Sequence, residues 1–374
     1  MTPQRILHVG ALPPPLGGIA VTMQALLKAK ALQSFESQVF NISRGTPWEI
    51  VGYKSVDLKR AMRRLKLAVQ LWLHIRKWHP ALVHFHCGSS GPWDFLGDML
   101  MFLAIKLHKI KIVFHWHCNP SLTFFPGRTR ATQLIFQMTA GTADALFVLS
   151  ERYRRILPDL YANKTFVIPN TFDSSLLSIP NPRPIRRFVH VIFIGRLTRE
   201  KGIWDVIQIA SKLVDKASNV RFLVAGQPSP VEGGMDRLQR AIKELDIESN
   251  IKFIGSIVEE EKKRFFNEGD IMLSPSHRES FGIAALEGMA SGIPVVAYSI
   301  GLLPDLIKNG LGGFLADQGD IDGLVSGLYR IVQDPALRER MGEYGREQAK
   351  RRYDINIVAE KVRNIYSTLL GYPG

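Results

Sequence analysis

Two glutamates, Glu279 and Glu287, stand with seven residues between them in the stretch SPSHRESFGIAALEGMASGIPVVA. A helix that starts near Phe281 and Gly282 would leave Glu279 in the loop before it and Glu287 about five residues inside it. The backbone N–H groups of Phe281, Gly282 and Ile283 could then hold a diphosphate. Since a carboxylate repels a dianion, we expect the two glutamates to hydrogen-bond sugar hydroxyls on either side of it.

Two basic residues, Arg196 and Lys201, follow another apolar run in the sequence VIFIGRLTREKG. Fixed cations beside the first N–H groups of a helix suit a diphosphate, whose negative charge grows as it leaves. Gly17 and Gly18 precede a further expected helix from about Ile19, where glycine lets the backbone approach a phosphate or sugar. The G-x-G-x-x-G pattern is absent there, so we predict no nicotinamide or flavin site.

These residues need sheets to position them, and the whole chain alternates short apolar runs with helix-like stretches. That alternation is typical of parallel sheets covered by helices on both faces. The expected strands of the first half are Arg5–Val9, Gln38–Asn41, Leu82–His86, Lys111–His115, Ala145–Leu149 and Thr165–Ile168. Those of the second half are Val189–Ile194, Arg221–Ala225, Ile251–Ile254, Ile271–Leu273, Pro294–Ala297 and Gly313–Leu315. The sequence therefore predicts an α/β fold with two doubly wound parallel sheets.

A proline-rich segment, SIPNPRPIRR at residues 178–187, separates the two series of strands. Its three prolines cannot continue a helix or lie inside a sheet. We expect residues 1–180 and 188–354 to form two Rossmann-like domains joined by a linker at 181–187. Because open parallel sheets bind ligands beyond the carboxyl ends of their strands, two facing sheets would form a cleft.

The combination of PSHRESFGIAALEGMASGIPVVA with GRLTREKG, about eighty residues earlier, resembles the signature of the retaining, metal-independent glycosyltransferases of family 4. PPPLGGI near the start and NGLGGFL near the end are also similar to that family, so the resemblance covers nearly the whole chain. It implies the GT-B fold, in which a final helix at 355–370 returns to the first domain and completes it through residue 374. It also implies a nucleoside diphosphate sugar of the UDP or GDP type as donor, with no cofactor.

The resemblance also implies roles for individual residues. Arg196 and Lys201 would hold the donor diphosphate, and Glu287 the ribose. Glu279 would contact hydroxyls of the transferred sugar, while the pair Gly17–Gly18 would close over the phosphate and sugar. The donor-binding set is completed by the start of the helix, Ser280, Phe281, Gly282 and Ile283.

A histidine after the fourth strand of the first domain commonly lies beside the reacting sugar in this family. His115 and His117 in KIVFHWHCNP could both fill that place, and we favour His117 because it is nearer the carboxyl end of the strand. Two loops depart from the family pattern: GQP stands for a usual Gly-x-Gly, and IGLLPD for a usual Gly-Gly with a following Glu. These departures leave the identity of the donor open.

The net charge of +14 is carried by the first half of the chain. Residues 1–187 hold 24 Lys and Arg against 9 Asp and Glu, whereas residues 188–374 hold 24 against 25. Much of the excess lies in DLKRAMRRLKLAVQLWLHIRKW, where five cations precede apolar residues: Lys59, Arg60, Arg63, Arg64 and Lys66. Such a segment is typical of helices that dock on anionic membranes, although a solvated helix packed on its own core would have the same pattern.

We therefore expect a lipid-linked or glycan acceptor, used in polysaccharide, lipopolysaccharide or glycolipid synthesis at the cytoplasmic face of the cell membrane. The longest apolar run, MLMFLAI, is too short to span a bilayer, and Ile6–Val9 is too short for a signal-peptide core. Two cysteines favour a reducing compartment. Nucleic acid is not expected as a partner, because no recognition module accompanies the basic segment.

Other interpretations of the same residues remain open. HFHC at 84–87 and HWHC at 115–118 put His84 with His86, and His115 with His117, on the same side of their strands, so each pair could bind zinc. A nucleotide-sugar epimerase or an inverting transferase would need a similar diphosphate site. An inactive sugar-nucleotide sensor or membrane adaptor would not need Arg196, Lys201, Glu279 and Glu287 together. Finally, no Asp-x-Asp metal motif lies in a plausible donor loop, so we expect transfer without a divalent ion.

Overall fold

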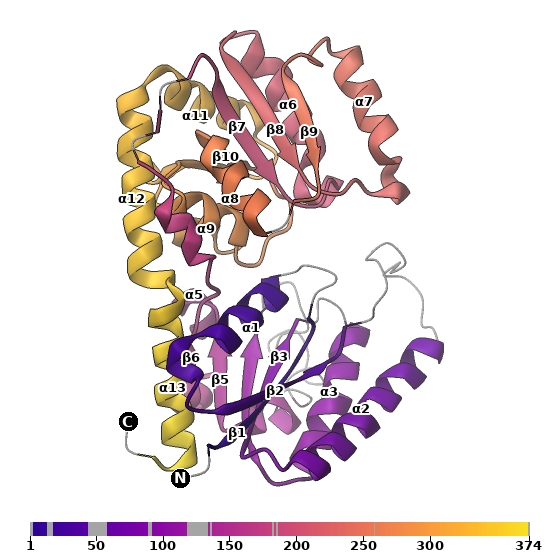
Figure 1. Ribbon diagram of the computed structural model, residues 1–374. Helices are drawn as coiled ribbons and strands as arrows, with labels where there is room; N and C mark the ends of the chain where they lie inside the picture. Colours follow the sequence, from indigo (N-terminus) through magenta and orange to yellow (C-terminus); the bar gives the residue numbers. More distant parts are fainter. Residues whose placement is uncertain are drawn as a thin grey trace. The chain divides into compact units, whose positions relative to one another are not determined.

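The computed structural model describes residues 3–12, 18–43, 58–88, 92–117, 134, 137–181, 183–184, 186–257 and 259–372. The chain divides into two compact units, one made of Met1–Thr171 with Ile355–Gly374 and the other of Phe172–Asp354. Figure 1 shows the strands and helices of both units, coloured along the sequence. Within the described residues, no helix is both long and apolar enough to cross a membrane.

The first unit contains a six-stranded parallel sheet in the order β2-β1-β3-β4-β5-β6. Its strands are β1 Arg5–Gly10, β2 Glu36–Asn41, β3 Leu82–Cys87, β4 Lys111–Trp116, β5 Ala145–Val148 and β6 Thr165–Val167. Its helices are α1 Gly18–Lys28, α2 Leu58–Trp78, α3 Pro92–Lys106, α5 Glu151–Arg154 and α13 Ile355–Leu370. Side chains of α1 and α13 pack on one face of the sheet in a single apolar core, which includes Leu26, Val358, Val362 and Tyr366.

The opposite face of this sheet meets α3. Phe102 of α3 packs edge-on against Phe85 of β3 and Phe114 of β4. Because side chains alternate along a strand, Phe85 points away from its neighbours His84 and His86. The sheet is therefore covered on both faces, as parallel sheets require.

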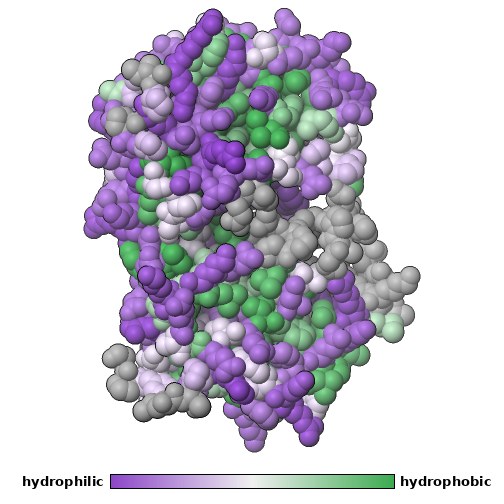
Figure 2. All heavy atoms as spheres, in the orientation of Figure 1, coloured by the Kyte–Doolittle hydropathy of each residue, from purple (hydrophilic) through white to green (hydrophobic). Residues whose placement is uncertain are grey.

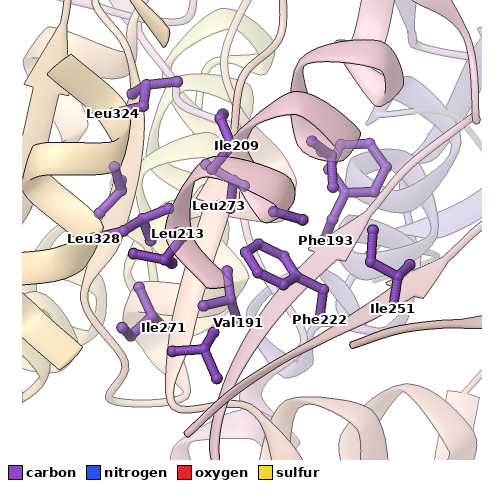
Figure 3. Close-up of a cluster of buried hydrophobic side chains, with 14 of the residues drawn as sticks. Val191, Phe193, Ile209, Leu213, Phe222, Ile251, Ile271, Leu273, Leu324 and Leu328 are labelled. Carbon is purple, nitrogen blue, oxygen red and sulfur yellow. The ribbon is translucent and has the colours of Figure 1, made fainter. Parts of the chain in front are cut away.

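The second unit repeats the design, with its six strands in the order β12-β11-β10-β7-β8-β9. They are β7 Val189–Ile194, β8 Val220–Ala225, β9 Ile251–Gly255, β10 Ile271–Ser274, β11 Val295–Tyr298 and β12 Gly313–Ala316. The helices are α6 Ile203–Val214, α7 Gly234–Glu244, α8 Glu259–Glu268, α9 Ile283–Ala290, α10 Leu303–Leu306, α11 Ile321–Gln333 and α12 Pro335–Tyr353. Side chains of α6 and α11 pack against β7, β8 and β10 in the core drawn in Figure 3, which includes Leu213, Phe222, Leu273 and Leu328. The prediction of two doubly wound parallel sheets is confirmed.

The segment expected to link the domains packs as part of the second unit, whose first residue is Phe172. Arg183 donates hydrogen bonds to the carbonyl oxygens of Asn267 (2.6 Å) and Ser291 (2.8 Å). Arg186 also donates to the carbonyl oxygen of Asn267, at 3.0 Å. The basic ending of the segment therefore fastens it to the second unit, and the boundary lies before the expected linker.

Candidate active site

The loops that follow β7 and β10 lie next to each other in the second unit. These two strands are neighbours in the sheet, with β8 and β9 beyond β7, and β11 and β12 beyond β10. The strand order therefore changes direction between β7 and β10. At such a point, open parallel sheets bind ligands beyond the carboxyl ends of the strands.

Two glycines, Gly202 after β7 and Gly301 after β11, let their loops lie close to the loop after β10. Gly202 has φ of 80°, and a Cβ atom there would lie 1.9 Å from the carbonyl oxygen of Pro275. Gly301 has φ of 55°, and a Cβ atom there would lie 2.1 Å from the carbonyl oxygen of Glu279. A larger residue at either position would displace backbone, so glycine is needed to place Glu279 where it lies.

Lys201 and Glu279 form an ion pair across this junction. The Lys201 ammonium lies 2.8 Å from Oε2 of Glu279 and 3.5 Å from the carbonyl oxygen of Arg278. Burial raises the pKa of Glu279, but the charge of Lys201 and hydrogen bonds from Lys201, Ser280 and Gly282 outweigh it, so the pKa falls below its ordinary value. Glu279 is therefore ionised at neutral pH.

The helix that follows Glu279 begins as predicted, and Glu279 hydrogen-bonds the backbone directly before it. Gly282 stands directly before α9, whose first residue is Ile283. Oε1 of Glu279 accepts hydrogen bonds from the N–H groups of Ser280 (3.0 Å) and Gly282 (3.1 Å). The Gly282 N–H, which was expected to bind a diphosphate, is thus paired with Glu279, so a diphosphate would have to displace that carboxylate to reach it; Phe281 is buried.

Glu287 is the fifth residue of α9 and is 2% exposed. Its carboxylate pairs with the ammonium of Lys262 on α8. Burial raises the pKa of Glu287, with a further increase from Asp173, and Lys262 only partly offsets the effect. The structure thus separates the two glutamates by environment: Lys201 and two N–H groups hold Glu279, whereas the half-buried Lys262 holds the more deeply buried Glu287.

The remaining residues expected to bind the donor are placed as follows. Arg196 is exposed in the loop after β7, five residues before Lys201. Gly18 is the exposed first residue of α1, which agrees with the predicted helix start, and Gly17 lies outside the described residues.

Both candidate histidines of the first unit are buried, and both have each ring nitrogen in a hydrogen bond. His117 lies just beyond β4 and contacts His86 Nδ1 through Nε2 (3.0 Å) and Asn170 Oδ1 through Nδ1 (3.1 Å). His115 contacts His84 Nε2 through Nδ1 (3.2 Å) and the carbonyl oxygen of Ile168 through Nε2 (3.2 Å). His117 is nearer the carboxyl end of the strand, as expected.

The four histidines considered for zinc do lie together on one face of the sheet, with His8 of β1 beside them. The sets His8, His84, His86 and His86, His115, His117 each bring three possible metal ligands within 4.8 Å of one another. Ring nitrogens of these five histidines also form hydrogen bonds from ring to ring.

The basic segment forms helix α2, but its cations differ in environment. Arg64 pairs with Asp98 of α3 at 3.2 Å, and its side chain is only 15% exposed. The expectation that Arg64 faces a membrane is therefore wrong, because the residue joins α2 to α3. Arg63 and Lys66 are exposed, and the side chains of Lys59 and Arg60 lie outside the described residues.

A second polar network supports the loop after β10, and sequence reasoning missed it. His277 Nε2 lies 3.0 Å from Oδ2 of Asp205 on α6, and the hydroxyl group of Tyr298 donates to the same oxygen at 2.6 Å. Gln318 donates to the carbonyl oxygen of His277 at 3.0 Å. The positions of His277 and Tyr298 at the carboxyl ends of β10 and β11 were the available signal. Lys262 gave no such signal, because its role depends on how α8 packs against α9.

Comparison with known proteins identifies the family of this chain. Residues 16–176 match the family model "Glycosyltransferase Family 4", and residues 185–348 match "Glycosyl transferases group 1". The chain is 28% identical to the capsular polysaccharide biosynthesis glycosyltransferase CapM of Staphylococcus aureus over 48% of this chain and 46% of that protein. The matched segment thus spans less than half the length of CapM.

A longer match is found with D-inositol 3-phosphate glycosyltransferase of Corynebacterium glutamicum, which is 29% identical over 88% of this chain and 81% of that protein. Among solved structures, Anabaena HepE in complex with UDP superposes with a TM-score of 0.72 at 17% identity, over 98% of this chain and 100% of that one. These matches cover both units. The chain belongs to the group 1 glycosyltransferases of family 4, with the GT-B fold.

Proposed function

We propose that this protein transfers a sugar, with retention of configuration, from a nucleoside diphosphate sugar to a membrane-associated acceptor. The observation that carries the proposal is the Lys201–Glu279 pair at the point where the second sheet changes direction. It joins a cation suited to a diphosphate with an ionised carboxylate suited to sugar hydroxyls. The UDP complex of HepE, a protein of the same fold, supports a UDP-type donor, and GDP is the alternative.

In this proposal, Lys201 and the exposed Arg196 stabilise the negative charge that develops on the departing diphosphate. Two fixed cations take the place of a divalent ion. Glu279 is ionised and already positioned by backbone N–H groups, so it can accept hydrogen bonds from the transferred sugar without reorganisation. Gly17 and Gly18 would close over the phosphate and sugar.

Two of the proposed roles require a change of partner. Glu287 would bind the ribose only by sharing its carboxylate with Lys262 or exchanging that ion pair for ribose hydroxyls. His117 would contact the sugar only by releasing His86 or Asn170. Glu287 and His117 would therefore have to give up an existing interaction in order to bind the donor, whereas Glu279 would not.

The test is to incubate the purified protein with a panel of UDP and GDP sugars and to measure hydrolysis of each. We expect one donor to be hydrolysed, with chelator present, and we expect the anomeric proton signals of the first product to show retention. The Lys201→Ala variant is the control for contaminating hydrolases. Activity that requires added magnesium, or a first product of inverted configuration, would overturn the corresponding part of the proposal.

An apolar surface on the first unit supports the membrane-associated acceptor. Met62, Leu65, Val69 and Leu73 of α2 are 51–64% exposed, and their spacing of three or four residues places them along one side of the helix. Leu100 and Leu103 of α3, and Leu107 directly after it, are also exposed, and a groove lined by residues from both helices joins the two rows. Figure 2 shows hydrophobic side chains at the surface among hydrophilic ones in this unit.

We call these seven side chains the apolar stripe. Arg63 and Lys66 are exposed on the same helix, and Lys106 lines the groove. Apolar side chains flanked by cations fit the interface of an anionic bilayer, where the side chains enter the lipid and the cations meet the headgroups. This face would hold the enzyme at the cytoplasmic surface of the cell membrane, beside a lipid-linked acceptor.

A further inference from the structure

Five buried histidines lie side by side on one face of the first sheet. His8 comes from β1, His84 and His86 from β3, and His115 and His117 from β4 or its end, and none is more than 6% exposed. The sheet order places β3 between β1 and β4. The ring centroids lie 3.9 Å apart both between His84 and His86, which stack, and between His115 and His117, which are tilted.

One line of contacts runs from α13 across the sheet. The Tyr366 hydroxyl lies 2.5 Å from His84 Nδ1, His84 Nε2 lies 3.2 Å from His115 Nδ1, and His115 Nε2 lies 3.2 Å from the carbonyl oxygen of Ile168. A carbonyl oxygen can only accept, so His115 must carry its proton on Nε2. His84 must then donate from Nε2, and Tyr366 must donate to His84. With both rings neutral, each of these contacts has one donor and one acceptor.

A second line runs parallel to the first. His8 Nδ1 lies 3.3 Å from His86 Nε2, His86 Nδ1 lies 3.0 Å from His117 Nε2, and His117 Nδ1 lies 3.1 Å from Asn170 Oδ1. The Thr22 hydroxyl donates to the same oxygen at 3.0 Å. With Oδ1 as the acceptor, His117, His86 and His8 must each carry their proton on Nδ1. In this line the contacts require His86 and His117 to be neutral, because each must accept through Nε2.

An added proton would disrupt the lines at three of the five rings. A protonated imidazole donates from both nitrogens, so at His115, His86 or His117 it would direct an N–H at a nitrogen that already donates to that ring. The charge would also be buried beside other rings. Burial lowers the pKa of all five histidines, to about 4 for His8 and His117.

The first line ends on both segments through which the chain passes between its units, and the second line ends on one of them. Ile168 and Asn170 directly precede the end of the first unit at Thr171, and Tyr366 belongs to α13, with which the chain re-enters that unit. The first line therefore ties both connecting segments to β3 and β4. The second line ties Asn170 to the same strands and to Thr22 of α1.

We propose that the five histidines form a pH-sensitive lock that fastens both connecting segments to the first sheet while all five imidazoles are neutral. Among the residues that the structure describes, the titratable groups that face these rings are the rings themselves and the Tyr366 hydroxyl from α13. From α1 the lock meets Thr22, from β5 the edge of Phe147, and from the end of β6 the Ile168 carbonyl and Asn170, none of which titrates.

The first test is to assign the tautomers by long-range ¹⁵N NMR on the full-length protein with labelled histidine. We expect His84 and His115 to be protonated on Nε2, and His8, His86 and His117 on Nδ1, all neutral at pH 7. A spectrum with charged rings, or with the opposite tautomers in the first line, would overturn the proposal. Addition of Zn²⁺ to the same sample tests the metal alternative: shifts of these signals at stoichiometric zinc would show a metal site instead.

The second test is amide hydrogen exchange with the Tyr366→Phe variant, which removes one hydroxyl group and keeps the packed ring. We expect protection of α13 to fall about 10-fold at pH 7, with no change in the strands of the second unit. Acidification of the wild type to about pH 5 should produce the same local loss after correction for intrinsic rates. The matched control is His79→Asn, which removes an exposed histidine of the same unit. Equal protection of α13 in wild type and Tyr366→Phe would overturn the proposal.

Discussion

At the scale of single residues, Lys201 is the group on which the proposed chemistry depends most. Its ammonium group already contacts Glu279, so a donor diphosphate would enter a site where one positive charge is shared between the protein and the ligand. The Thr198 hydroxyl accepts a hydrogen bond from the Lys201 N–H at 3.3 Å and fixes the backbone before the side chain. The position of the charge is therefore set before substrate binds, which lowers the reorganisation that catalysis requires.

Lys201→Ala should lower kcat/KM by at least about 100-fold, roughly 3 kcal/mol, because it removes a preorganised charge partner of the diphosphate. Glu279→Ala should lower turnover more than donor affinity. Because the two side chains touch, their effects should not add, with a coupling energy on the order of 1 kcal/mol. Steady-state kinetics and calorimetry with the free nucleoside diphosphate measure both effects. Lys212→Ala, which breaks an exposed ion pair with Asp322, is the control; additive losses would contradict the coupling.

Glu287 and Lys262 call for a different experiment, because the carboxylate of their ion pair is buried. Lys262→Met leaves an unpaired buried carboxylate and should destabilise the second unit by about 3 kcal/mol, while Lys262→Met with Glu287→Leu should recover most of that loss. Chemical denaturation followed by tryptophan fluorescence measures both. If Glu287 also binds the ribose, the double variant will be stable but will bind nucleoside diphosphate weakly. A stable double variant with normal nucleotide affinity would remove Glu287 from the donor site.

At the scale of elements, helix α2 has two apolar sides. Ala68, Leu71, Ile75 and Trp78 are buried against the first unit, whereas the residues of the apolar stripe are exposed. The two interpretations offered by the sequence, a core-packed helix and a surface-binding helix, are thus compatible. A helix that packs and also exposes apolar side chains is typical of interaction surfaces.

The apolar stripe can be tested on vesicles of anionic phosphatidylglycerol. Val69→Ser with Leu73→Gln should reduce binding at least about 10-fold, because it removes two side chains that would enter the lipid, each worth about 1.5–3 kcal/mol when fully buried. Arg63→Glu with Lys66→Glu should weaken binding and reduce its salt dependence. Co-sedimentation measures both, and Leu160→Gln, at an exposed leucine elsewhere in the first unit, is the control. Undiminished binding by both double variants would leave α2 as a solvated helix.

The elements themselves were largely predictable, since apolar runs such as Val189–Ile194 and the helix at 355–370 carry strong periodic signals. The proximity of Lys201 to Glu279 was also predictable, because both residues lie in loops that follow strands of one sheet. Other pairings were hidden. Arg64 meets Asp98, and Glu287 meets Lys262, only because particular helix faces pack together. No local pattern encodes those contacts, and the capping of Gly282 by Glu279 depends on a side-chain conformation.

At the scale of the whole molecule, the buried histidines make the stability of the first unit depend on pH. In the folded state the pKa of each of these histidines lies below the ordinary value of 6.5, and for His8 and His117 it is about 4. Between pH 4 and pH 6.5 the unfolded chain therefore binds more protons than the folded one. The free energy of unfolding of the first unit should therefore be highest above about pH 6.5 and decrease as the pH falls toward 4. For His8 and His117 the loss is roughly 3 kcal/mol each, reduced by their coupling.

Urea denaturation at pH 7, 6 and 5 measures this effect. We expect the midpoint of the first unit to fall steadily, and that of the second unit to change less. The fall should also be present in His79→Asn, because that exposed histidine lies outside the network. Equal midpoints for the first unit at all three pH values would contradict the assignment of five neutral buried rings.

The two units are built from different segments of the chain, and this has a consequence for synthesis on the ribosome. The second unit is continuous, whereas the first needs residues from both ends of the chain. Until α13 is made, the core around Ile6, Leu26 and Phe147 lacks Val358, Val362 and Tyr366, and His84 lacks its hydroxyl donor. The half translated first is therefore completed last. During translation its open apolar face would be a binding site for chaperones, and a ribosome that stalled before Ile355 would release a chain with one finished unit and one unfinished.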